Sequence, residues 1–304
     1  MTAPRDSLLA PDDNRRMFDR IAARYDLLNA VMSFGLHRRW RRLAIAALSP
    51  RAGGSYLDVG AGTGDLSLEL LRVCPTARLV ALDPSAPMIS FAHSKLTRAG
   101  FSPSSSPSSS PSSSSSSTAC GFAVSSSPPN AFRCASPLNV DGGVSSSPSP
   151  SASSAFSAVD PSPSPSPLLL VATASDPSLP SGSFDGVVSA FVLRNIADRS
   201  VALTNLRRVL VPGGRAVFLD LTVPSSRLLR LGHRLYTRLF FPPLGRLLAG
   251  SAAAYRYLAD SVQHFPPVAD ILSSFSSAGF ANPRAVPLSG GVVTLFIAEN
   301  GTRN

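Results

Sequence analysis

The chain lacks the long apolar runs that mark membrane spans and secretory signals. No uninterrupted stretch of about 20 apolar residues occurs, and the N-terminal segment MTAPRDSLLAPDDNRR is neither apolar nor long enough for a convincing transit peptide. We therefore expect a cytoplasmic protein that is soluble or bound peripherally at the inner face of the membrane.

Cysteine is scarce, and its spacing excludes two kinds of site. Cys74, Cys120 and Cys134 show no CxxC spacing and no neighbouring histidine cluster. Structural zinc sites and disulfide frameworks both need such groupings. We expect neither a metal site nor a disulfide framework.

Lysine is almost absent, and Lys95 is the only one. Arginine therefore carries nearly all of the positive charge in a chain of formal net charge +10. Such an excess suits a polyanion or an anionic membrane surface. The densest run, HRRWRR from His37 to Arg42, resembles a nucleic-acid patch. On a helix, however, its arginines would point in several directions around one buried tryptophan, so we favour a solvated helix face or a substrate-side surface and expect no nucleic-acid partner.

One long segment has almost no charge and few apolar residues. Residues 101–167 consist mainly of serine and proline, a composition that cannot bury a core and predicts a disordered insert. The rest of the 304 residues suits one domain, built from residues 51–100 and 168–300, after an N-terminal helical lid over residues 12–50.

Within that domain, apolar segments of strand length alternate with amphipathic segments of helix length. This rhythm predicts a Rossmann-like α/β fold with helices on both faces of a mostly parallel sheet. Seven strands are expected, at residues 56–59, 79–82, 168–174, 186–191, 215–223, 282–289 and 291–299.

The segment YLDVGAGTGDL, Tyr56 to Leu66, predicts a strand, a glycine-rich turn and a helix. Gly60, Gly62 and Gly64 alternate, whereas the dinucleotide fingerprint G-x-G-x-x-G would place its third glycine at Asp65. Carboxylates flank this turn and would repel a pyrophosphate, which prefers the positive end of a helix. S-adenosylmethionine carries a sulfonium and an ammonium group, so this turn favours it over NAD.

A second strand strengthens that interpretation. RLVALD ends at Asp83, roughly the 20 residues downstream at which an acidic side chain meets ribose hydroxyls. The alternative is that G-x-G-x-G marks only a tight strand-to-helix turn, because such short motifs carry false positives.

Several longer motifs resemble the quinone C-methyltransferases of menaquinone and ubiquinone biosynthesis, within the class I S-adenosylmethionine-dependent methyltransferases. The resemblance covers nearly the whole chain except the insert. It is carried by MFDRIAARYDLLNAVMSFGLHRRWRR, LDVGAGTGDL, FVLRNIADR, RVLVPGG, AYRYLADSVQHFP and PLSGGVVTLF. The RYDLLN, LRNI and YRYL segments are much more specific than the glycine turn or PGG.

The resemblance implies that Thr63 and Asp83 contact the cofactor and that Thr173 and Ala174 lie near its adenine. Threonine at 173 departs from the family's usual Asp or Asn, which implies a weaker hydrogen bond to adenine. The cofactor-binding residues expected from the turn and the resemblance are Asp58, Gly60, Gly62, Thr63, Gly64, Asp83, Thr173 and Ala174.

Methyl transfer to a ring carbon needs alignment and an electron-rich ring. We expect Arg194 and Asn195 to form the catalytic polar end that stabilises a ring oxyanion, with water or another side chain as the base. The alternative makes Arg194 a structural ion-pair residue and Asn195 the N-cap of the following helix. His37 and His264 are candidate bases, although such histidines are more often surface or satisfied residues.

The run from Arg227 to Leu248 alternates arginines with leucine and aromatic residues. It is typical either of a basic helix at an anionic membrane surface, which would suit a prenylated substrate, or of a helix packed on the sheet.

The favoured function is C-methylation of a prenylated hydroquinone by S-adenosylmethionine, with demethylmenaquinol preferred over the ubiquinone precursor. Another small phenol or a nucleic acid is an alternative substrate, although no Asn-Pro-Pro-Tyr-type motif follows the fourth strand. A further alternative is a catalytically silent scaffold that binds partners through the insert.

Overall fold

The computed structural model describes residues 10–105, 166–224, 226–232, 235–236, 239 and 261–301. Internal contacts group residues 1–108 and 163–304 into one compact unit. Most of the predicted insert, most of the amphipathic run and the AYRYLAD segment at 254–260 lie outside the described residues.

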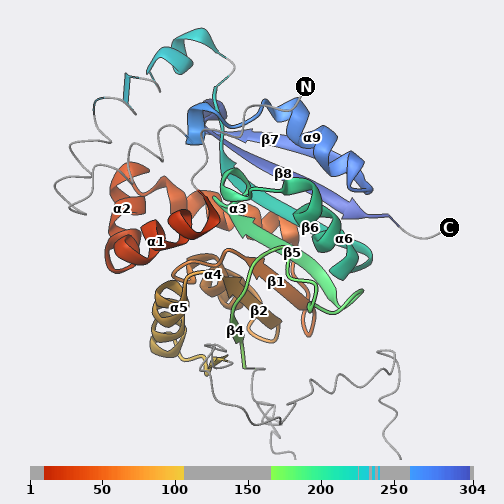
Figure 1. Cartoon of the computed structure of the whole chain (residues 1–304). Coiled ribbons are helices and arrows are strands. Elements are labelled where there is room, and N and C mark those ends of the chain that lie inside the picture. The colour runs from red at the N-terminus through yellow and green to blue at the C-terminus, as the bar shows by residue number, and fades with distance from the viewer. Residues whose placement is uncertain are drawn as a thin grey trace, which may run out of the picture. The chain divides into compact units, whose positions relative to one another are not determined.

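A mostly parallel sheet forms the centre of this unit (Figure 1). Its strand order is β3-β4-β2-β1-β5-β6-β8-β7, and only β8 runs antiparallel to both of its neighbours, β6 and β7. The strands are β1 (Ser55–Val59), β2 (Arg78–Asp83), β3 (Ser104–Ser105), β4 (Leu168–Val171), β5 (Phe184–Ala190), β6 (Leu210–Leu221), β7 (Phe280–Leu288) and β8 (Val293–Asn300).

All seven predicted strands are present, and the two-residue strand β3 is additional. Ser104 donates its backbone N–H to Pro167 O at 2.9 Å and pairs in parallel with Leu168. Its neighbour Phe101 packs against the core. The prediction that the disordered insert begins at residue 101 is therefore wrong at this end, because Phe101 packs on the core and Ser104–Ser105 form the edge of the sheet.

Strand β6 begins earlier than the prediction of residue 215. Leu210 already pairs with Phe184, whereas the next pair joins Arg215 to Gly186. The residues between them, including the Pro212-Gly213-Gly214 turn, therefore bulge out of the ladder. Helix α6 ends at Val209, before the proline.

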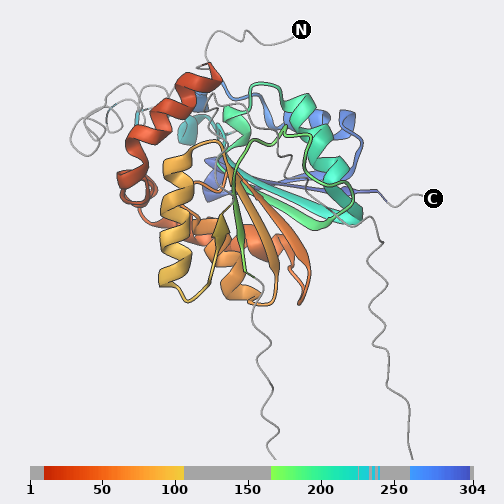
Figure 2. The same ribbon diagram turned by 60° about the horizontal axis from the view of Figure 1, so that its bottom comes forward.

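Helices cover both faces of the sheet (Figure 2). Helices α3 (Leu36–Leu48), α4 (Asp65–Val73) and α5 (Ala86–Arg98) pack into one core cluster. Helices α6 (Arg199–Val209) and α9 (Val268–Ser277) pack into the other. This two-sided layering confirms the predicted fold class.

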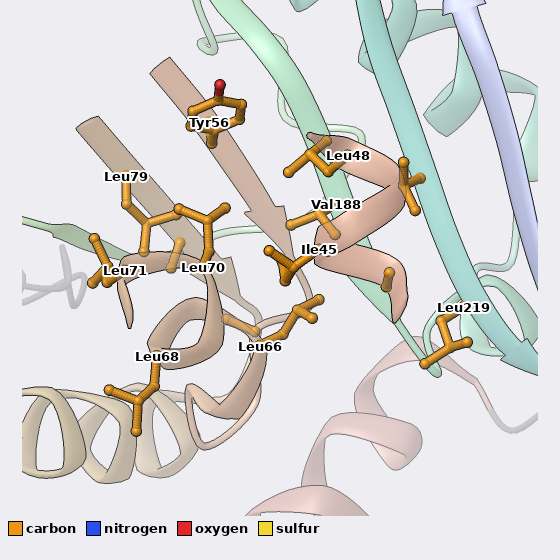
Figure 3. Close-up of a cluster of buried hydrophobic side chains, with 14 of the residues drawn as sticks. Ile45, Leu48, Tyr56, Leu66, Leu68, Leu70, Leu71, Leu79, Val188 and Leu219 are labelled. Atoms are coloured by element: carbon orange, nitrogen blue, oxygen red, sulfur yellow. The ribbon is translucent and has the colours of Figure 1, made fainter. Parts of the chain in front are cut away.

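Strand alternation decides which side chains enter each cluster. Successive side chains of a strand point to opposite faces, so Tyr56 joins the cluster beside α3 and α4 while Leu57 joins the cluster beside α6. Figure 3 shows Tyr56 with Ile45 and Leu48 of α3 in that first cluster. The Tyr56 hydroxyl accepts a hydrogen bond from Arg51 N at 2.7 Å, which satisfies its buried polar atom.

The predicted lid segment divides into two parts. Helices α1 (Pro11–Ile21) and α2 (Tyr25–Met32), joined by the turn η2 (Ala22–Arg24), share a small apolar cluster of their own. Helix α3 instead packs on β5 and β6. Within the described part of the chain, no helix is long and apolar enough to cross a membrane.

Candidate active site

The glycine turn joins β1 to α4 in a conformation that side chains rarely adopt. Gly60, Gly62 and Gly64 have φ values of 66°, 56° and 81°. A Cβ atom on Gly60 would lie 2.4 Å from Val192 Cγ2, and one on Gly64 would lie 2.9 Å from Ala92 Cβ. The lack of a side chain at these glycines thus allows the left-handed backbone. It also lets the residues after β5 and helix α5 approach the turn closely.

Asp83, at the end of β2, holds this turn in place. Its Oδ2 accepts a hydrogen bond from Gly62 N and its Oδ1 accepts one from Ser85 N, both at 2.9 Å. Burial raises the pKa of Asp83 to about 6, against the effect of these two bonds. Each carboxylate oxygen keeps a further lone pair that can accept a ligand hydroxyl.

A cavity of about 420 Å³ opens at the carboxyl ends of the parallel strands. This edge of an α/β sheet is where ligands bind. Among the predicted site residues, Gly60, Gly62, Asp83, Thr173, Ala174 and Asn195 line this first cavity.

Asp58 does not line the first cavity, because it lies inside β1 and is covered by helix α4. Its side chain faces the α4 layer, where Ser67 Oγ donates to Asp58 Oδ2 at 2.6 Å. Asp58 Oδ1 is buried without a hydrogen-bond partner. Burial raises the pKa of Asp58 to about 7. The residue lies beneath the turn and outside the lining of the cavity.

Thr63 and Gly64 also lie outside that lining. Thr63 Oγ1 donates instead to Asp26 Oδ1 of α2 at 2.5 Å. Lys95 Nζ of α5 donates to Thr63 Oγ1 at 3.1 Å and pairs with Asp26 Oδ2 at 2.6 Å and with Asp65 Oδ1. We call these four residues the lid clasp, because they tie the lid helix α2 to the glycine turn.

A second cavity, of about 430 Å³, lies beside α2 and α3. Most of its described lining is apolar. The lining includes Met32, Phe34, Leu36, Trp40, Phe191, Leu221, Leu228, Leu229, Val262 and Val292, and its polar members include Asn29, Ser33, His37, Arg194, Tyr236 and Ser289. Trp40 Nε1 donates to Ser289 Oγ at 2.9 Å, which fixes one wall.

Phe191 lines both cavities. It follows β5 and has a φ of 65°, a strained value for a residue with a side chain. Its ring makes an edge contact with Trp40 at a centroid distance of 6.4 Å, and the guanidinium of Arg194 lies 5.8 Å from its centroid. Phe191 is therefore the wall that the two cavities share.

The structure separates the two predicted catalytic residues. Asn195 lines the first cavity, whereas Arg194 lines the second. Arg194 Nη1 pairs with Asp220 Oδ1 at 2.6 Å in a buried ion pair, and Arg194 N donates to Asp220 Oδ2 at 3.1 Å. The structure thus contains the ion pair that the structural alternative for Arg194 predicted.

The N-cap alternative for Asn195 is wrong. Helix α6 begins at Arg199, and Asp198 caps it by accepting a hydrogen bond from Val201 N at 3.1 Å. Asn195 lies in the short turn η3 (Leu193–Asn195), and its Nδ2 donates to Phe191 O at 3.3 Å. This bond fixes the backbone at the shared wall.

Sequence reasoning missed several residues of the first cavity. Asn14, Arg15 and Phe18 of α1 line it, together with Val192 and Asp198. No local motif marks these α1 residues, because they reach the cavity only when the lid folds over the β2 end. Asp198 was detectable, since an Asp directly before a helical pattern is a typical cap.

His264, the second candidate base, lines neither cavity. His37 lines the second one and is buried. Of the two candidate bases, His37 therefore lines a cavity and His264 does not.

Comparison with known proteins agrees with this architecture. A model of the ubiE/COQ5 methyltransferase family matches residues 10–106 and 168–300. The chain belongs to this family. The match to the ubiE/COQ5 family omits only residues 107–167 between its two parts, which fall within the predicted insert.

Two curated relatives in the family cover almost the whole chain. The ubiquinone/menaquinone biosynthesis C-methyltransferase UbiE of Syntrophotalea carbinolica is 32% identical over 284 residues, which is 93% of this chain and 92% of that protein. The demethylmenaquinone methyltransferase of Thermus thermophilus is 31% identical over 283 residues, covering 93% of this chain and 99% of that protein.

Solved structures agree on the fold. The crystal structure of a SAM-dependent methyltransferase from Thermotoga maritima, described as a possible histamine N-methyltransferase, superimposes with a TM-score of 0.52 at 14% identity. It covers 94% of this chain, and this chain covers 99% of it. The predicted methyltransferase fold is thereby confirmed.

Proposed function

We propose that this protein transfers a methyl group from S-adenosylmethionine to a ring carbon of a prenylated hydroquinone, with demethylmenaquinol as the preferred substrate. The observation that carries the proposal is the pair of cavities on either side of Phe191. The cavity at the glycine turn, which carries Asp83 and Asp198, suits the cofactor, and the apolar cavity beside it suits a prenylated ring. Membership of the ubiE/COQ5 family supports the proposal independently.

The residues of the first cavity fit the cofactor. Asp83 lines it with spare acceptor capacity for the ribose hydroxyls, and Thr173 and Ala174 line the region proposed for adenine. Asp83 and Asp198 supply negative charge near a ligand that carries two positive groups. When bound, S-adenosylmethionine supplies an electrophilic methyl group on its sulfonium.

In the second cavity, the protein's task is alignment and exclusion of water. Trp40 and Phe191 provide flat apolar walls for a ring, and such walls hold reacting atoms in a productive geometry. Arg194 keeps its charge because an arginine remains protonated, and Asp220 fixes its orientation. We propose that Arg194 stabilises the ring oxyanion and that Asn195 shapes the shared wall.

Ubiquinone-precursor methylation is the second candidate. One relative is named for both pathways, whereas the Thermus relative is named for demethylmenaquinone alone. A direct comparison of kcat/KM for demethylmenaquinol and a 2-polyprenyl-methoxy-benzoquinol discriminates the two. Higher kcat/KM with the benzoquinol would reverse our assignment.

The cofactor proposal is tested by isothermal titration of the purified protein with S-adenosylhomocysteine. We expect saturable micromolar binding. Absence of heat at any accessible concentration would contradict an enzyme and favour the scaffold alternative.

We also propose that the protein docks on an anionic membrane to collect its lipid-soluble substrate. Leu228 is 79% exposed and Leu231 is 65% exposed, in a segment that also carries Arg227 and Arg230. Leu228 and the exposed Phe34 line the second cavity, so the apolar surface adjoins that cavity. Apolar groups beside basic ones are typical of binding at an acidic lipid surface.

Flotation with acidic liposomes tests this docking. We expect the wild-type protein to float and a Leu228→Ser/Leu231→Ser variant to lose most of the floated fraction. Val73→Ser is the matched control, because Val73 is an exposed apolar residue at the end of α4. Equal flotation of all three proteins would contradict docking through these leucines.

A further inference from the structure

His37 in α3 is a buried histidine whose hydrogen bonds define its protonation pattern. Ser33 Oγ lies 2.6 Å from Asn29 O and 2.7 Å from His37 Nδ1. It also accepts a hydrogen bond from His37 N at 3.2 Å. His37 and Ser33 both line the second cavity.

The single hydroxyl proton of Ser33 selects the tautomer of His37. A carbonyl oxygen only accepts hydrogen bonds, so the Ser33 proton must point to Asn29 O. The contact with Ser33 Oγ then requires His37 Nδ1 to be the donor. Because a neutral imidazole carries one N–H, Nε2 is left as an acceptor.

Within the described part of the chain, no hydrogen bond joins His37 Nε2 to another residue, and His37 is only 4% exposed. His37 lines the second cavity, so a ligand in that cavity that carries a hydrogen-bond donor could satisfy this acceptor.

The charges around His37 favour the neutral ring. Burial lowers the pKa of His37 below its ordinary value of 6.5, and the neighbouring Arg41 and Arg38 lower it further. Asp65 and Asp26 act in the opposite direction, and Arg194 lies across the cavity. The net effect of burial and of these charges favours the neutral imidazole.

The other titratable groups in the described lining of the second cavity are poor proton acceptors. Arg194 holds its proton and is paired with Asp220. Tyr236 donates its hydroxyl proton to Met32 O at 2.9 Å, and burial raises the pKa of Tyr236. His37 is thus the one group of this described lining that accepts a proton near neutrality.

We propose that His37 Nε2 is the catalytic base that removes a ring hydroxyl proton from the quinol, an inference that rests on the proposed function. The O–H electron pair then feeds the ring, whose carbon forms a bond to the methyl carbon as the bond from methyl to sulfur breaks. The methylated ring carbon loses its hydrogen as a proton, and His37 returns its proton to the ring oxygen. One proton is released overall, and no external oxidant or reductant is needed.

His37→Asn tests the chemistry while preserving the structural contact, because the asparagine amide can still donate to Ser33 Oγ. We expect kcat to fall on the order of a hundredfold, the typical contribution of a general base. The melting temperature and the affinity for S-adenosylhomocysteine should stay unchanged. His93→Asn, the same substitution on α5 at a residue lining neither cavity, is the control.

The pH profile separates a base from a packing residue. Wild-type kcat/KM should decline on the acid side with an apparent pKa below 6.5, and His37→Asn should lose this limb. Full activity of His37→Asn with an intact acid limb would overturn the inference and leave the proposed function standing. Absence of quinol methylation by the wild-type protein would overturn the proposed function and this inference with it.

The tautomer is tested without turnover. Long-range proton–nitrogen spectra of the labelled protein, assigned with His37→Asn, should show a protonated Nδ1 and an unprotonated Nε2 at neutral pH. The Ser33→Ala variant should lose this single-tautomer signal. A protonated Nε2 in the wild-type protein would overturn the inference.

Discussion

At the residue scale, two buried aspartates near the glycine turn have different tasks. Asp83 ends β2, faces the first cavity and accepts backbone hydrogen bonds from both of its flanking turns. Asp58 lies in β1 and faces α4, with only Ser67 as a partner. The sequence pattern suggested both as cofactor ligands, yet only Asp83 lines the cavity, because Asp83 ends its strand at the carboxyl edge of the sheet whereas Asp58 lies inside β1 under α4.

Asp83→Asn should weaken cofactor binding. An amide has only one acceptor oxygen, so its NH₂ group would face either Gly62 N or Ser85 N. We expect a loss of about 2 kcal/mol, roughly thirtyfold in the dissociation constant of S-adenosylhomocysteine, measured by titration calorimetry. Asp185→Asn is the control and should bind normally, because Asp185 lies near the start of β5, at the end of that strand away from the first cavity. Equal affinity of the two variants would contradict the assigned role of Asp83.

Asp58 predicts an unusual dependence of stability on pH. Its pKa is about 7 in the folded protein and near 3.8 when unfolded, so the folded state binds its proton more tightly. The free energy of unfolding should therefore fall as pH rises from about 4 to about 7, on the order of 4 kcal/mol from this group, and then level off.

Denaturant unfolding at a series of pH values measures this effect. Asp58→Asn should remove the part of the fall that Asp58 contributes, because the amide does not titrate, and should leave the smaller part from Asp83, whose pKa is raised to about 6. The exposed control Asp13→Asn should retain the whole fall. The same slope in Asp58→Asn and the wild-type protein would show that Asp58 is ionised in the fold.

At the element scale, the lid clasp connects α2 to the glycine turn and α5. The chain's only lysine, Lys95, contacts Asp26, Thr63 and Asp65, and its side chain is 17% exposed. Arg41 of α3 adds a bond to Asp65 at 2.6 Å. The signals that bound α5 are local in the sequence, because Ser85 caps the helix and apolar spacing continues to Leu96. The clasp itself was not predicted, since its partners are far apart in the chain.

Lys95→Met should loosen the lid without unfolding the domain. Asp65 keeps Arg41, whereas Asp26 is 47% exposed in its side chain and loses only a screened partner, so we expect about 1 to 2 kcal/mol of local destabilisation. Amide hydrogen exchange over Tyr25–Met32 should accelerate by roughly tenfold. Lys95→Arg retains the charge and serves as the control. Unchanged exchange in Lys95→Met would contradict the clasp.

At the scale of the whole molecule, both cavities are assembled from distant segments. The first is lined both by Asn14 of α1 and by Asp198 before α6, and in the second Trp40 bonds to Ser289. Periodicity and turn residues were sufficient to predict seven strands and a helical N-terminal segment, because those signals are local. The walls of the two cavities, and the place of Phe191 as their shared residue, depend on tertiary packing. Local signals in one sequence do not reveal that packing.

Cofactor binding should stabilise the whole fold. A ligand that binds only the folded state at a hundred times its dissociation constant adds about 2.7 kcal/mol to the free energy of unfolding. We therefore expect S-adenosylhomocysteine to raise the melting temperature in the wild-type protein and much less in Asp83→Asn at the same concentration. A large and equal rise in both proteins would place the ligand outside the first cavity.

The most direct test of the account is product analysis after incubation of the purified protein with demethylmenaquinol and S-adenosylmethionine carrying an isotopically labelled methyl group. The account predicts that the label appears on a ring carbon of the naphthoquinol, as mass spectrometry and NMR of the extracted quinone would show. A label on a ring oxygen, or no label in the quinone while S-adenosylhomocysteine binds normally, would contradict it.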